Sequence, residues 1–202
     1  VAPVNLNYLL WRNPENLKTR SILALGFNPE DSLLIDEQFK AKAKSLKNPG
    51  RVLFDTLSRP EFGPIEEWYK NGKNVETEVA GKRVKVEGLV ELGPSFGADG
   101  NLITSRETFL RLLSSNPKGS IEIGLIKLSN GSDHKLIKNI LNKSLPNDVR
   151  VLTKREFIDF EKNYWRDSTA IGFIFSLGAL MGFVVGCVVV YQILYSDVSD
   201  HL

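Results

Sequence analysis

The residues best suited to chemistry are few in this 202-residue chain. His134 and His201 are the only histidines, and Cys187, the only cysteine, lies within an apolar run. Metal sites and nucleophile–base pairs draw heavily on these residue types. His134 is interpreted as a surface residue at a helix start, and the apolar run separates it from His201. We therefore predict no enzymatic activity, no metal site and no intramolecular disulfide.

Phosphate-binding motifs are also scarce. The G-x-x-x-x-G-K-[ST] pattern of ATP-binding loops does not occur, so we expect no bound cofactor. The glycine-rich stretch Leu92–Asn101 could hold an anion on its backbone amides, but Asp99 would repel phosphate, and a rigid turn is the alternative. The net charge is +2, without a concentrated basic patch, which argues against a nucleic-acid partner.

A second constrained loop, Ser58–Pro64, carries two prolines around Phe62-Gly63. Constrained loops often hold function, although a simple strand-to-helix connection explains this one equally well. The candidate partner contacts in the two loops are Arg59, Glu61, Phe62, Phe96 and Asp99.

The stretch Thr169–Leu194 contains 26 residues and no charged side chain. As a helix it would be about 39 Å long, enough to cross a hydrocarbon core of about 30 Å. A buried core helix of this length would show a polar face, which this one lacks. Tyr164 and Trp165 precede it, as aromatic anchors do at a membrane interface.

Within this predicted membrane helix, Gly178, Gly182 and Gly186 repeat every four residues and share one face. Small residues at this spacing allow a second helix to approach closely, so we predict a helix-packing site. General enrichment of glycine in membrane helices is the alternative.

The chain before the apolar run predicts an α+β domain, because helical and strand patterns alternate. We expect strands at 4–13, 20–29, 51–54, 120–129 and 148–152, and helices at 36–47, 104–115 and 132–144. Apolar residues expected to be buried on the last two helices are Phe109, Leu110, Leu112, Leu113, Leu136, Ile137, Ile140 and Leu141.

A hairpin is the clearest local prediction. With a two-residue turn at Ala80-Gly81, charged residues of opposite sign face one another, and β-branched residues share the other face. The expected pairs are Glu78 with Arg83, Glu76 with Lys85, Thr77 with Val84 and Val75 with Val86.

Two capping boxes are predicted, Thr104 with Glu107 and Thr153 with Glu156. The second opens a helix at Lys154. Because no glycine or proline follows before the apolar run, we expect this helix to continue unbroken into the membrane.

Four segments, "LWRNPE", "SILALGFNP", "SRPEFGP" and "SFGADGNLI", carry a family resemblance. In this order they resemble the extracytoplasmic domain of DevC-type permeases of cyanobacterial ABC exporters, which belong with the MacB- and FtsX-like permeases. The hairpin with Gly88 is similar to that of MacB periplasmic core domains. The resemblance covers the whole chain.

The resemblance implies a MacB-like periplasmic core domain at 1–152, a connecting helix at 153–168, a transmembrane helix at 169–195 and a truncated cytoplasmic tail at 196–202. Such a permease forms a homodimer, binds a separate cytoplasmic ATPase and contacts a membrane fusion protein joined to an outer-membrane channel. It transmits ATP-driven motion to export a glycolipid or similar substrate. We interpret the chain as a fragment of a larger membrane protein.

Charge and resemblance disagree on orientation. Lys154, Arg155, Lys162 and Arg166 precede the apolar run and no basic residue follows it, which favours a cytoplasmic domain. The family implies an inner-membrane protein with residues 1–168 in the periplasm, and the charge rule weakens for long translocated domains. An alternative function is a single-pass sensor or anchored ligand-binding protein with an extracellular α/β domain.

Overall fold

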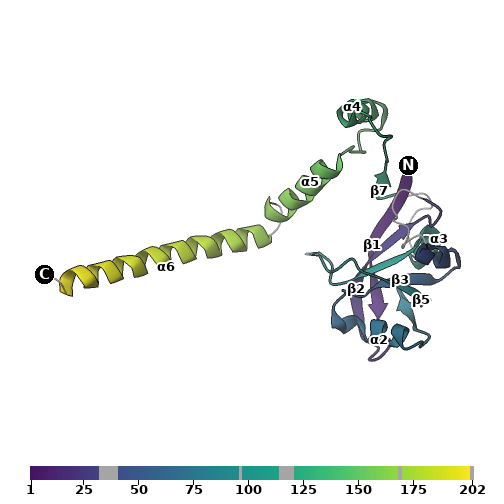
Figure 1. Cartoon of the computed structure of the whole chain (residues 1–202), viewed down its shortest axis with the longest axis horizontal. Coiled ribbons are helices and arrows are strands. Elements are labelled where there is room, and N and C mark those ends of the chain that lie inside the picture. Colours follow the sequence, from purple (N-terminus) through teal and green to yellow (C-terminus); the bar gives the residue numbers. More distant parts are fainter. Residues whose placement is uncertain (32–40, 96, 114–120, 168–169, 201–202) are drawn as a thin grey trace. The chain divides into compact units, whose positions relative to one another are not determined.

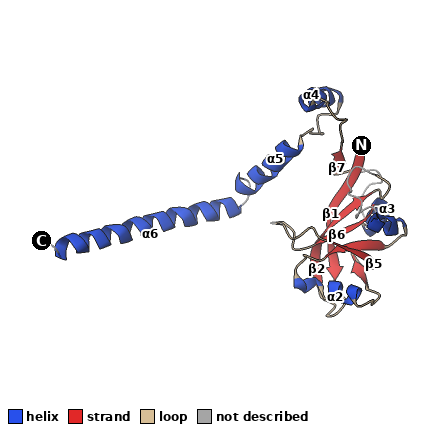
Figure 2. Ribbon diagram, viewed as in Figure 1, coloured by secondary structure: helices blue, strands red, loops and turns tan. Residues whose placement is uncertain are grey.

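The computed structural model describes residues 1–31, 41–95, 97–113, 121–167 and 170–200. The chain divides into two compact units, Val1–Lys127 and Leu128–Leu202. The first unit holds the strands and the second unit holds three helices (Figure 1). The predicted mixed α+β class, with a long apolar helix at the C-terminal end, is confirmed (Figure 2).

The bounds of the elements follow chain order. The first unit contains β1 (Ala2–Arg12), β2 (Thr19–Phe27), η2 (Lys44–Lys47), β3 (Arg51–Asp55), η3 (Pro60–Phe62), α2 (Ile65–Lys70), β4 (Glu76–Val79), β5 (Lys82–Val90), β6 (Asn101–Ser105), α3 (Arg106–Leu112) and β7 (Ile123–Leu125). The second unit contains α4 (His134–Ser144), α5 (Lys154–Asp167) and α6 (Ala170–Asp200).

The strands form one sheet in the order β2-β6-β3-β5-β4-β1-β7. The long strand β1 also pairs with β2 along most of its length, so the order returns to its start and the sheet closes on itself. Its contact with β4 is the single pair Trp11 with Val79. The pairs β2–β6 and β3–β5 are parallel, and the others are antiparallel.

The predicted β4–β5 hairpin is confirmed in its register, with Glu78 opposite Arg83 and Thr77 opposite Val84. The ion pairs, however, do not run straight across. Arg83 reaches diagonally to Glu76 at 2.5 Å, and Glu78 pairs instead with Arg12 of β1 at 2.9 Å. Long side chains reach diagonal neighbours, so register alone does not decide the partner.

The core lies between the sheet and the helices α2 and α3. Strands β3 and β6 are buried on both faces over nearly their whole length, which explains their continuous runs of apolar residues. Trp11 and Phe54 contact each other with ring centroids 5.2 Å apart, and Phe54 contacts Phe62 at 6.4 Å. Such aromatic pairs add about 0.5–1.5 kcal/mol beyond the area they bury.

Two predictions for the first unit need correction. The capping residue of α3 is Ser105, whose hydroxyl accepts a hydrogen bond from the Thr108 amide, and not Thr104. The reason is that Thr104 belongs to β6 and donates to the Arg51 carbonyl at 2.7 Å. The strand predicted at 120–129 is confirmed only over β7. The helix predicted at 36–47 lies partly outside the described residues, and residues 41–47 are helical.

The burial predicted for the next helix is wrong. Helix α4 forms as predicted, with Asp133 as its N-cap, but Leu136 and Ile140 are 58% and 56% exposed. Residues 148–152, predicted as a strand, are irregular. Among its described residues the second unit has no strand, so the apolar face of α4 has no sheet of its own unit to cover.

Helix α5 begins with the predicted capping box. The Thr153 amide donates to Glu156 Oε2 at 2.8 Å, and the Glu156 amide donates to Thr153 Oγ1 at 3.3 Å. Lys138 of α4 forms an ion pair with Glu156 at 2.6 Å. The hydrogen bond from Lys138, followed by that from the Thr153 backbone, lowers the pKa of Glu156 to about 2.

This capping contact is expected to be acid-sensitive. Because folding lowers the pKa of Glu156 from 4.5 to about 2, its stabilisation is complete above pH 4.5 and is lost as the pH falls toward 2. Backbone chemical shifts of residues 153–157 in a pH titration should report loss of the first turn of α5. Glu156→Gln should abolish that pH dependence, and an unchanged titration in this variant would contradict the assignment.

Helix α6 is long and apolar enough to cross a membrane. Its segment Gly172–Ser199 has 28 residues, a mean hydropathy of 2.5 and no buried part. The helix extends through residues 196–200, which were predicted as a tail. At about 1.5 Å per residue this segment measures about 42 Å, more than a hydrocarbon core of about 30 Å requires.

The prediction of one unbroken helix from Lys154 is not supported by the residues on either side of the join. Helix α5 ends at Asp167 and α6 begins at Ala170, and residues 168–169 lie outside the described part. A Cβ placed on Gly172 would overlap the carbonyl of Arg166. A straight helix separates these residues by about 9 Å along its axis, so the two helices do not continue in a straight line.

Candidate functional site

Two loops singled out in the sequence lie against each other in the first unit. We call residues 56–64 and 91–100 the loop pair. The Arg59 side chain contacts Asp99 with its Nε 2.9 Å from Oδ1, and the Arg59 amide donates to the Asp99 carbonyl at 3.0 Å. Phe96, another predicted contact residue, lies outside the described residues. The structure thus brings Arg59 and Asp99 together.

Arg20 of β2 completes a charged cluster on this surface. Its Nη2 lies 2.5 Å from Asp99 Oδ2, and its Nη1 lies 3.8 Å from Glu61 Oε1. The hydrogen bond from Arg20 lowers the pKa of Asp99, and the same bond raises the pKa of Arg20. Both groups therefore stay charged over the physiological range. Sequence reasoning missed Arg20, because it lies inside a strand pattern 79 residues from Asp99.

A buried carboxylate holds the two loops in place. Asp55, at the end of β3, is 0% exposed. It accepts hydrogen bonds from the Leu57, Leu92 and Gly93 amides at 3.2, 2.9 and 3.0 Å. Asn101 Nδ2 donates to it at 2.7 Å. A single side chain therefore satisfies donors from both loops and from β6.

Phe62 is not a partner contact, which corrects that prediction. Its side chain is 0% exposed and packs in the core, and its carbonyl accepts a hydrogen bond from Trp11 Nε1 at 3.0 Å. Gly100 makes this packing possible, because a Cβ there would lie only 2.6 Å from the Phe62 ring and 2.7 Å from Ser58 Oγ. Phe62 thus anchors its loop from beneath while Arg59 and Glu61 remain at the surface.

The exposed part of the loop pair is partly apolar. Leu57 and Leu92 are each 54% exposed, although their amides are both bound by Asp55. Apolar side chains on a rigid backbone, rimmed by charged groups, are typical of protein-contact surfaces. Their sequence context, a turn after each strand, carried no signal that distinguished them from other loop leucines.

The remaining predicted site residues lie in the second unit. Gly178, Gly182 and Gly186 lie on α6, and a Cβ at each would meet open space. Tyr164 and Trp165 lie at the end of α5 with their rings in an edge-to-face contact, centroids 5.9 Å apart. Among the described residues, no group of three or more His, Cys, Asp or Glu side chains is placed to hold a metal ion.

Comparison with known proteins adds no family. No protein-family model matches the chain, and no curated protein matches it.

Proposed function

We propose that the chain is part of a permease subunit of an ABC exporter of the DevC type, in the MacB- and FtsX-like family. In this proposal α6 crosses the inner membrane and residues 1–168 lie in the periplasm. A separate cytoplasmic ATPase binds and hydrolyses ATP. The permease dimer passes the resulting motion to a membrane fusion protein and outer-membrane channel, which release a glycolipid or similar substrate.

One observation supports this proposal most directly. The two loops that carry the most specific part of the resemblance form one surface, linked by Arg59 and Asp99 and held from beneath by Asp55. A surface fixed in this way can receive or deliver a mechanical displacement without rearranging. The same chain carries α6, a helix suited to the membrane.

The coupling route would run through the chain itself. Movement of α6 relative to the membrane would displace α5, whose start is tied to α4 by the Lys138–Glu156 ion pair. The loop pair would then act as the contact with the fusion protein, with Leu57 and Leu92 as its apolar centre and Arg59 at its charged rim. No chemical step is required of the chain.

Substituting the apolar centre tests the proposed contact. In the full-length permease, Leu57→Glu combined with Leu92→Glu should weaken binding of the fusion protein about tenfold or more, because both side chains would bring charge into the contact. Pull-down with the fusion protein and an export assay would measure this. As a matched control, Val149→Glu changes another exposed apolar residue, 48% exposed, in the second unit.

The result separates the two candidate functions. Loss of export with normal expression and normal ATP hydrolysis supports the coupling role. Wild-type binding and export in the double variant would overturn the loop pair as the contact. Two further apolar helices in the parent chain after residue 202 would favour the permease, whereas a cytoplasmic signalling module there would favour the sensor.

The glycine face of α6 provides a second test. Gly182→Leu should hold a neighbouring membrane helix away and cost about 1–2 kcal/mol of packing. The first unit should keep its stability, because the substitution lies outside it. Disulfide crosslinking between membrane helices should decrease, and Ala179→Leu on another face of α6 serves as the control. Wild-type crosslinking and export in the Gly182 variant would contradict helix packing at this face.

A further inference from the structure

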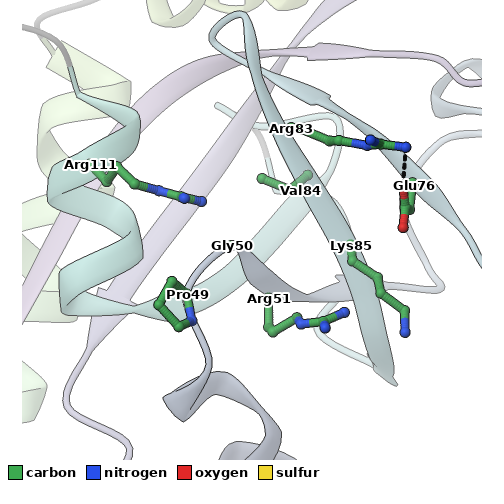
Figure 3. Close-up of a pocket in the computed structure, with 8 residues that line it drawn as sticks. All are labelled: Pro49, Gly50, Arg51, Glu76, Arg83, Val84, Lys85 and Arg111. Atoms are coloured by element: carbon green, nitrogen blue, oxygen red, sulfur yellow. Dashed lines mark ion pairs between the residues drawn. The ribbon is translucent and has the colours of Figure 1, made fainter.

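We propose that the first unit has a second site, separate from the loop pair, that binds a phosphate group. A surface pocket of about 220 Å³ lies where β3 begins (Figure 3). Because a water molecule takes about 30 Å³ in the liquid, the pocket has room for a phosphate and a small attached group. Its lining residues are Pro49, Gly50, Arg51, Glu76, Arg83, Val84, Lys85 and Arg111.

Three elements bring four positive side chains to this pocket. Arg51 opens β3 and lies opposite Lys85 in the parallel β3–β5 pair. Arg83 is two residues before Lys85 and so shares its side of the strand. Arg111 comes from the last turn of α3. Figure 3 shows the Arg111 side chain on one side of the β5 ribbon and Lys85 and Arg83 on the other.

The pocket has more positive than negative charge. Glu87 forms ion pairs with both Arg51 and Lys85, and Glu76 pairs with Arg83 at 2.5 Å. Four cations against these two carboxylates leave a surplus of two positive charges. A phosphate monoester carries about −1.5 to −2 at pH 7 and would balance this surplus.

Arg111 is the side chain best placed to receive the anion. Among the described residues its guanidinium has no anionic partner. Gly50, with a φ of +75°, leaves it room, because a Cβ there would lie 2.7 Å from Arg111 Nη2. A planar guanidinium presents paired N–H donors that match two phosphate oxygens, and Arg83 and Lys85 line the same pocket.

The ligand class is therefore a phosphate monoester. It could come from a soluble phosphate compound or from the phosphate headgroup of a lipid. The site goes beyond the proposed coupling role and does not depend on it, since none of its residues belongs to the loop pair.

Calorimetric titration of the full chain in uncharged detergent micelles tests the site. The probes are inorganic phosphate and, separately, dihexanoyl phosphatidic acid, with chloride at equal ionic strength as the reference. We expect saturable binding of phosphate. Arg111→Gln should weaken it about tenfold, because one charge-assisted contact is lost. Glu76→Gln should strengthen it about threefold, because Arg83 is released from its carboxylate partner.

Arg155→Gln is the matched control, because it removes the same charge from exposed α5 and should change binding less than about twofold. Tighter binding of phosphatidic acid than of phosphate would identify a lipid headgroup, and equal binding would identify a soluble phosphate; both support the site. No saturable binding of either probe would overturn it. Equal weakening by Arg111→Gln and Arg155→Gln would also overturn it, because a general charge effect would then suffice.

Discussion

Asp55→Asn is expected to lower the free energy of unfolding of the first unit by about 3 kcal/mol. The asparagine amide would replace one carboxylate oxygen and point its own N–H groups at two donors that now have an acceptor. Each buried polar group left unsatisfied costs about 1–3 kcal/mol. Urea unfolding of the full chain, followed by the fluorescence of Trp11 and Trp68, would measure the loss.

The control for this variant is Asp159→Asn, the same chemical change on the exposed surface of α5, which should alter stability by less than about 0.5 kcal/mol. Hydrogen exchange adds a local readout, since the Leu57, Leu92 and Gly93 amides should lose protection in the Asp55 variant. If both variants unfold alike, Asp55 does not hold the loop pair together.

Asn163→Pro is expected to abolish export in the full-length permease. Proline within α5 removes one backbone hydrogen bond and clashes with the preceding turn, which costs about 3 kcal/mol or more and kinks the helix. The first unit should still fold, because its core lies upstream. ATP hydrolysis by the partner subunit should continue, but its motion should no longer reach the loop pair.

Asn163→Ala controls for loss of the side chain, because alanine keeps the helix, and should export normally. The measurements are substrate release, ATP hydrolysis and expression level, compared in the same cells. Export at the wild-type level in the proline variant would show that α5 need not be a stiff link. Since α5 and α6 do not run in a straight line, this result would favour a flexible tether such as a sensor carries.

Local patterns accounted for much of the first unit. The alternation in β4 and β5 predicted their register, because cross-strand neighbours differ by fixed steps along the chain. The Thr153–Glu156 capping box followed from a spacing of three residues. Where a side chain had a choice of distant partners, the same reasoning failed, as Thr104 and the ion pairs of Glu78 show.

By itself the sequence determined the strands, the helix starts and the apolar helix α6, because these depend on neighbours within a few residues. Only the tertiary structure decided that Asp55 holds two loops from beneath, that Phe62 is buried and that Arg20 reaches Asp99. It also decided that the apolar face of α4 lies open and that Arg111 faces the start of β3. The physical reason is that a carboxylate, an arginine or an apolar side chain has the same local pattern in the sequence whether it is paired, buried or free. Its role is set by which distant segment closure of the sheet places beside it.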